Sequence, residues 1–120
     1  MKKLKLPQSN RCCYCRDKLE ESEKTREHIV PLKRGGNNTC KNVKTCCYSC
    51  NQLKQDKTLL EFKENIENNA RMEPGRKKRI IQSCDNLYKY CIKHNKGLFK
   101  NELFYMMWKS HTEANFKSLY

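Results

Sequence analysis

The second half of the chain repeats its apolar residues at the spacing of an amphipathic helix. Between Arg76 and about His94 they recur every three or four positions, at Ile80, Ile81, Cys84, Leu87, Tyr88, Cys91 and Ile92. Residues with this spacing share one face of a helix, so the pattern predicts a long helix that packs through this face. Gly97 is placed to end it.

Two shorter helices are predicted on either side. Thr58-Leu59-Leu60-Glu61 matches a capping box, which predicts a helix that runs to about Ala70 and is broken by Pro74-Gly75. The aromatic-rich stretch from Asn101 to His111 predicts a last helix. The C-terminal half is therefore expected to be mainly helical.

The first half contains only short apolar stretches, which are typical of strands. Arg26–Val30 and Asn42–Cys46 are predicted as two strands, with Pro31 ending the first because proline cannot donate to a sheet ladder. A loop with Gly35-Gly36 joins them. A helix is expected to begin near residues 47–49. The pattern therefore predicts an α+β fold.

Size and charge narrow the class of protein. The 120 residues are only 37% hydrophobic, so the core is small and a metal ion would help to stabilise it. The net charge is +13, spread over both halves, which favours a polyanionic partner such as nucleic acid. No apolar run is long enough for a membrane span or a signal peptide, so an intracellular, non-secreted protein is expected.

Four of the nine cysteines form two CxxC pairs, Cys12/Cys15 and Cys47/Cys50. Four thiolates brought together repel one another unless a soft divalent ion neutralises them, and tetrahedral zinc fits this set. A structural zinc ion is therefore predicted. The other five cysteines are expected to behave as small hydrophobic residues, with Cys84 and Cys91 on the apolar helix face.

The residues between and beside these pairs resemble the HNH endonuclease family. The resemblance rests on Glu27-His28-Ile29-Val30-Pro31, Gly35-Gly36, Asn42 and the sequence Cys47-x-x-Cys50-Asn51-x-x-Lys54. It covers roughly residues 11–62 and includes the zinc-knuckle subtype. The implied fold is a small ββα-metal finger stapled by the four-cysteine zinc site, followed by a mainly helical extension.

The resemblance also implies roles for individual residues. His28 would be the general base, because a neutral imidazole can take a proton from water. Glu27 and Asn51 would hold a catalytic divalent ion, Mg²⁺ or Mn²⁺, which prefers oxygen ligands. Asn42 would hold the loop and His28 in position. Glu27 stands where the family more often has Asp, and Asn51 where the third name-giving residue is His.

The implied substrate is DNA, with double-stranded DNA as the expectation. Seven basic residues are candidates to hold its phosphates: Lys33, Arg34, Lys54, Arg76, Lys77, Lys78 and Arg79. A run of charge at a helix start is also compatible with a solvated face, so the last four carry that alternative.

A second interpretation is a zinc-ribbon module that binds nucleic acid without cutting it. Such a module needs only its four cysteines and has no need for Glu27, His28, Asn42 and Asn51 at these positions, so the nuclease is preferred. We expect an HNH nuclease domain at residues 1–62 and a basic helical extension at 63–120. The last helix is expected to pack in the core or to form a homodimer contact.

Overall fold

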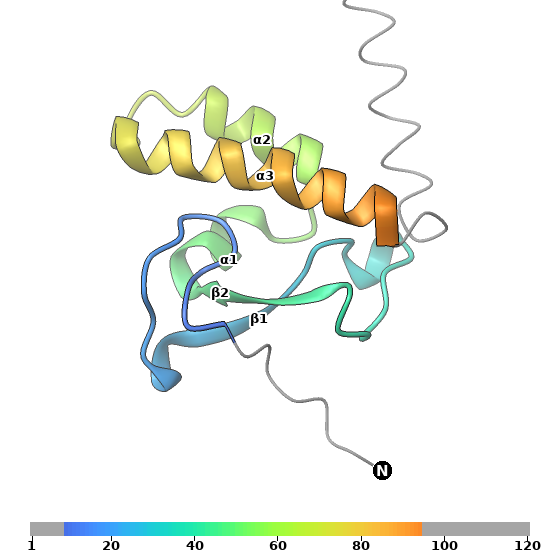
Figure 1. Ribbon diagram of the computed structural model, residues 1–120. Coiled ribbons are helices and arrows are strands. Elements are labelled where there is room, and N and C mark those ends of the chain that lie inside the picture. The colour runs from blue at the N-terminus through green and yellow to red at the C-terminus, as the bar shows by residue number, and fades with distance from the viewer. Residues whose placement is uncertain (1–8, 95–120) are drawn as a thin grey trace, which may run out of the picture.

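The computed structural model describes residues 9–94, and these form an α+β fold (Figure 1). A two-stranded antiparallel sheet of β1 (Lys24–His28) and β2 (Val43–Cys47) is followed by α1 (Tyr48–Lys54), α2 (Leu59–Glu67) and α3 (Pro74–His94). A short 3-10 turn, Glu21–Glu23, precedes β1, and a second one, Leu32–Arg34, lies between β1 and β2. The predicted fold class is confirmed. The predicted last helix, Gly97 and the first eight residues lie outside the described part.

Both strands lie slightly away from their predicted positions, and at the end of β1 a side chain takes the place of the ladder. β1 ends at His28, although the sequence predicts a strand through Val30. The amide of Asn42 takes over at Val30: Oδ1 accepts from Val30 N at 2.8 Å, and Nδ2 donates to Val30 O at 3.0 Å. The hairpin register pairs Glu27 with Lys44 and His28 with Val43.

The loop between the strands folds back on the end of β1. Gly35 has a φ of 94°, which side chains disfavour, and it ends the 3-10 turn. Gly36 lies against the backbone of Val30 so closely that a Cβ atom would be 1.8 Å from the Val30 carbonyl oxygen. Only glycine fits at position 36, so steric contact with Val30 explains the second glycine of the predicted turn.

The helix α1 begins at Tyr48, directly after Cys47, whose thiol caps it by accepting from Cys50 N at 3.3 Å. It carries Cys50, Asn51 and Lys54, as the sequence predicts. Its first turn therefore presents a knuckle cysteine, while the following positions face β1.

The helices α2 and α3 pack against each other and cover α1 and the sheet (Figure 1). The capping box of α2 is present, with Thr58 Oγ1 accepting from Glu61 N at 3.2 Å and Glu61 Oε1 accepting from Thr58 N at 2.9 Å. α2 ends at Glu67, before the predicted Ala70. Pro74 is expected only to break the preceding helix, but it is the first residue of α3. Proline suits this position because the backbone N–H groups of a first turn have no partner within the helix.

One core joins these elements. The predicted apolar face of α3 is buried at Ile80, Cys84, Tyr88 and Cys91. The ring of Tyr14, from the first knuckle, meets Phe62 of α2 edge-on with centroids 4.9 Å apart. The predicted division at residue 62 falls inside α2, whose two ends contribute Leu59 and Ile66 to this same core.

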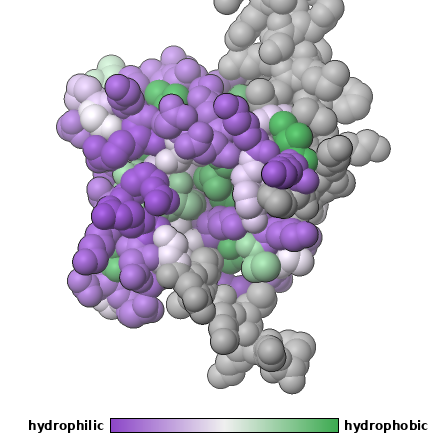
Figure 2. Space-filling view, in the orientation of Figure 1, coloured by the Kyte–Doolittle hydropathy of each residue, from purple (hydrophilic) through white to green (hydrophobic). Residues whose placement is uncertain are grey.

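The face of the molecule shown in Figure 2 is mostly hydrophilic, with small apolar patches. This matches a chain with a mean hydropathy of -1.02. Among the described residues, no helix is both long enough and apolar enough to cross a membrane.

Candidate active site and metal centre

The two CxxC pairs meet in one cluster. The sulfur atoms of Cys12, Cys15, Cys47 and Cys50 all lie within 4.8 Å of one another. A tetrahedral site with Zn–S bonds of about 2.3 Å separates its sulfurs by about 3.8 Å. Cys15 Sγ and Cys47 Sγ are 3.8 Å apart. The cluster is thus compatible with the predicted structural zinc.

The four sulfur atoms of the cluster also shift one another's pKa values. Hydrogen bonds from neighbouring thiols lower the pKa of Cys12 strongly. The pKa values of Cys15, Cys47 and Cys50 are raised because their thiols lie beside that sulfur. Zinc favours the thiolate form at every ligand, so a bound ion would offset the repulsion between the four sulfurs.

The remaining cysteines divide by burial. Cys46, Cys84 and Cys91 are buried, in agreement with their prediction as small hydrophobic residues, and Cys13 is half-buried. Cys40 is exposed on the hairpin loop. Cys46 Sγ lies 3.9 Å from Cys12 Sγ, beside the cluster but not within it.

The start of α3 is held on the knuckles by two arginines. Arg76 Nη2 donates to Ser49 Oγ at 2.9 Å and approaches Cys50 Sγ at 3.5 Å. Arg79 Nε donates to Cys15 O at 2.9 Å. The sequence predicts phosphate contacts for both residues, and in the structure both have partners in the two cysteine knuckles.

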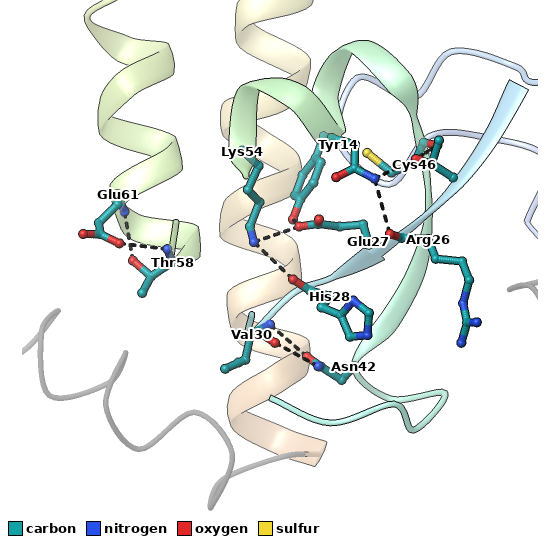
Figure 3. A network of polar contacts seen from close by, with 12 residues as sticks. Tyr14, Arg26, Glu27, His28, Val30, Asn42, Cys46, Lys54, Thr58 and Glu61 are labelled. Carbon is teal, nitrogen blue, oxygen red and sulfur yellow. Dashed lines mark hydrogen bonds and ion pairs between the residues drawn. The ribbon is translucent and has the colours of Figure 1, made fainter. Parts of the chain in front are cut away.

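Glu27 is a buried carboxylate with two partners on the same oxygen. Its Oε2 accepts from the Tyr14 hydroxyl at 2.5 Å and pairs with Lys54 Nζ at 2.8 Å (Figure 3). Burial raises the pKa of the Glu27 carboxyl, and the Lys54 ammonium opposes that rise. The other oxygen, Oε1, has no hydrogen-bond or ion-pair partner among residues 9–94. It is therefore the oxygen left for a ligand.

Lys54 occupies a different place from the predicted one. The sequence predicts a phosphate contact, but the Lys54 side chain is 0% exposed and pairs with Glu27. Its ammonium also donates to His28 O at 3.2 Å. A phosphate could reach Lys54 only if the ion pair opened, so the residue ties α1 to β1.

Asn51 is anchored in the same manner as Glu27. Its Nδ2 donates to Thr25 Oγ1 at 2.9 Å and to Arg26 O at 3.3 Å. The Thr25 hydroxyl donates onward to Cys46 O at 2.7 Å. Because a backbone carbonyl only accepts, these bonds orient the amide and leave Asn51 Oδ1 without a partner among the described residues.

Glu27, His28 and Asn51 line one cavity of about 440 Å³. His28 Nε2 lies 2.7 Å from Asn38 Oδ1. Figure 3 shows His28 and Arg26 projecting from β1 on the side away from Lys54 and Tyr14. Three of the four residues with predicted catalytic roles therefore line one cavity, at the junction of β1 and α1, and Asn42 does not line it.

Asn42 is fully buried and joins three parts of the hairpin. Besides its two bonds to Val30, its Nδ2 donates to Asn37 O at 2.8 Å. It thus ties the loop to Val30, two residues beyond His28, and makes no direct bond to the imidazole.

The other predicted phosphate-binding residues lie at the surface. Lys33 pairs with Asp56 at 3.2 Å, and Arg34 pairs with Glu61 at 2.9 Å. Lys77 Nζ donates to Asn69 O at 3.2 Å, and Lys78 is exposed. Lys33 also lines the cavity with His28.

The sequence prediction gives no role to four residues of this site, of which Asn38 contacts His28. Tyr14 and Thr25 hold Glu27 and Asn51 through hydrogen bonds, and the exposed Arg26 lines the cavity. Arg26 stands next to Glu27 in the chain, so its proximity could be anticipated. Tyr14 gives no such signal, because its bond to Glu27 depends on how the knuckle packs on the hairpin.

Comparison with known protein families gives a match over the part of the chain that carries this site. Residues 12–67 match the model of a family described as HNH endonuclease. The match begins at the first knuckle cysteine and ends with α2. No curated protein and no solved structure matches the chain. The family match supports a nuclease-type function with a nucleic-acid substrate. Over residues 12–67, just under half of its length, the chain is therefore similar to the HNH endonuclease family.

Proposed function

We propose that the protein is a metal-dependent endonuclease that hydrolyses DNA phosphodiester bonds. The observation that carries the proposal is the shared cavity of Glu27, His28 and Asn51. Glu27 is anchored through Oε2 and Asn51 through Nδ2. Glu27 Oε1 and Asn51 Oδ1 have no partner in the described chain. A zinc-binding turn alone has no need for this arrangement.

The proposed general base is His28. Its Nε2 lies 2.7 Å from Asn38 Oδ1, an oxygen that can only accept, so in the proposed tautomer Nε2 carries the proton and donates to Asn38. Nδ1 then keeps its lone pair and can take a proton from an attacking water. Asn38 would hold the imidazole in this tautomer.

The proposed ligands of the catalytic ion are Glu27 Oε1 and Asn51 Oδ1. A carboxylate oxygen and an amide oxygen form a hard donor set, which fits Mg²⁺ or Mn²⁺. When bound, such an ion supplies positive charge that stabilises the scissile phosphate and its leaving oxygen. Tyr14 and Thr25 would act as positioning residues, because each restrains one ligand side chain.

Several finer points belong to the same proposal. The substrate would be double-stranded DNA, with Lys33, Arg34, Lys77 and Lys78 near its backbone. Residues 1–62 would supply the chemistry and residues 63–120 a basic helical extension. A homodimer would form through the C-terminal helices, whose last member lies outside the described residues.

Incubation of the purified protein with supercoiled plasmid and Mg²⁺ or Mn²⁺ tests the proposal. We expect nicked or linear products that depend on the added ion. Retarded but uncut plasmid under all ion conditions would instead indicate the zinc-ribbon binding module.

A further inference from the structure

A second cavity, of about 480 Å³, lies where the first knuckle, β2 and α3 meet. Three cationic side chains line it, Arg11, Arg16 and Lys44, and no carboxylate does. Ser83, Asn86 and Tyr90 of α3 contribute hydroxyl, amide and aromatic groups to its wall. The cavity therefore combines positive charge with hydrogen-bonding groups.

None of the three cations has a carboxylate partner in residues 9–94. The ion pairs of this part of the chain involve other basic residues, including Lys33, Arg34, Lys54, Lys63 and Arg79. Arg11 Nη1 donates to Arg16 O at 2.9 Å, and Lys44 Nζ donates to Cys40 O at 3.3 Å. Carbonyl groups orient these side chains but leave their full charges uncompensated.

The placement of the cations is also restrained. Lys44 Nζ lies 4.5 Å from the centroid of the Tyr90 ring, a cation–π contact. Arg16 has a φ of 68°, so the knuckle turn holds it in a left-handed conformation. Positive charges gathered in a hollow repel one another, and an anion in the cavity would relieve that repulsion.

The cavity borders the hairpin that carries the proposed catalytic residues. Lys44 stands directly opposite Glu27 in the register, and Thr45, also in the cavity wall, stands opposite Arg26. One polyanion could thus contact both sites of this small domain.

We propose that this cavity binds a backbone phosphate of the nucleic acid, away from the bond that is cut. The inference rests on the proposed nuclease function. Arg11, Arg16 and Lys44 would neutralise the phosphate, and Asn86 and Ser83 would donate hydrogen bonds to it. The site would strengthen binding without taking part in the chemistry.

The test compares two full-length triple variants that lose equal charge. The cavity variant is Arg11→Gln, Arg16→Asn and Lys44→Gln, with Asn chosen because it tolerates positive φ. The control variant is Lys18→Gln, Lys89→Gln and Lys93→Gln, all exposed and outside this cavity. For each, the affinity for a duplex DNA is measured by fluorescence anisotropy over a range of salt concentrations.

We expect the slope of log K against log salt to become shallower by about 0.9 in the cavity variant, since one lost phosphate contact changes it by about that amount, and to change clearly less in the control. Equal slopes in the two variants would overturn the inference. Zinc content and circular dichroism verify folding. If the triple variant fails to fold, the single variant Lys44→Gln replaces it, and its slope should be shallower than that of wild type. Wild-type cleavage of plasmid in the same preparation tests the proposed function separately.

Discussion

At the scale of single residues, Tyr14 connects the metal centre with the proposed active site. It stands between Cys12 and Cys15 in the first knuckle, and its hydroxyl reaches Glu27. Burial raises the pKa of Tyr14 well above its ordinary value, so the hydroxyl stays a donor. The knuckle therefore presents a hydrogen-bond donor that restrains one oxygen of the proposed ligand.

Tyr14→Phe should raise the Mg²⁺ or Mn²⁺ concentration needed for half-maximal cleavage by about 10- to 100-fold, as expected for loss of a partner behind a metal ligand. The ring contact with Phe62 is preserved, so zinc content and the unfolding midpoint should change little. The matched control is Tyr48→Phe, at a tyrosine that is 67% exposed. An unchanged ion requirement in Tyr14→Phe would remove Tyr14 from the account.

Lys54→Met should destabilise the protein by about 3–5 kcal/mol, because it leaves the Glu27 carboxylate buried without its counter-charge. Urea denaturation followed by circular dichroism measures this. The double variant Glu27→Gln, Lys54→Met should recover part of the loss, since neither charge is then stranded. A surface phosphate contact predicts the opposite pattern, with stability intact and only DNA affinity reduced.

The sequence reveals some of these residues and hides others for a physical reason. The knuckle cysteines are recognisable because CxxC spacing is local, and the whole set of four is confirmed as a cluster. The pairing of Lys54 with Glu27 spans 27 positions and depends on the distance between α1 and β1. No pattern within either segment encodes that distance.

At the scale of elements, the docking of α3 on the knuckles is the main result that the sequence does not predict. Helical spacing correctly identifies its buried face. The sequence of the basic run at its start is typical of a solvated or phosphate-binding surface. In the structure, Arg76 contacts Cys50 and Arg79 contacts Cys15, both in the cysteine knuckles. The strand ends shift for a related reason, because the Asn42 side chain supplies the bonds of Val30.

Arg76→Met should weaken zinc binding by about 10- to 100-fold, because a cation beside a thiolate ligand stabilises its charge. Competition with a chromophoric chelator measures the affinity. Lys78→Met removes the same charge two residues along the helix, at an exposed site, and should leave zinc affinity near wild type. Equal affinities in both variants would show that Arg76 does not support the metal centre.

At the scale of the whole molecule, zinc and the catalytic ion should be separable. Four thiolates hold zinc with an apparent free energy of about 10 kcal/mol or more, and in a domain this small that is largely folding energy. One carboxylate and one amide should hold Mg²⁺ weakly.

Brief, mild EDTA treatment should therefore stop cleavage without changing the circular dichroism spectrum, and added Mg²⁺ or Mn²⁺ should restore it. Cys47→Ser should unfold the finger, because this residue is both a cluster member and the cap of α1, and no added Mg²⁺ should rescue it. Loss of fold and activity together under mild chelation would contradict this separation of roles.

The most direct test of the central claim compares wild type with His28→Ala on supercoiled plasmid in Mg²⁺, with DNA affinity and zinc content measured on the same samples. His28 makes its one side-chain hydrogen bond within the described chain to an exposed loop residue, so its removal should leave fold, zinc and DNA binding near wild type. The account predicts a loss of cleavage rate of about 100- to 10,000-fold. Cleavage by His28→Ala within a few-fold of wild type would contradict it.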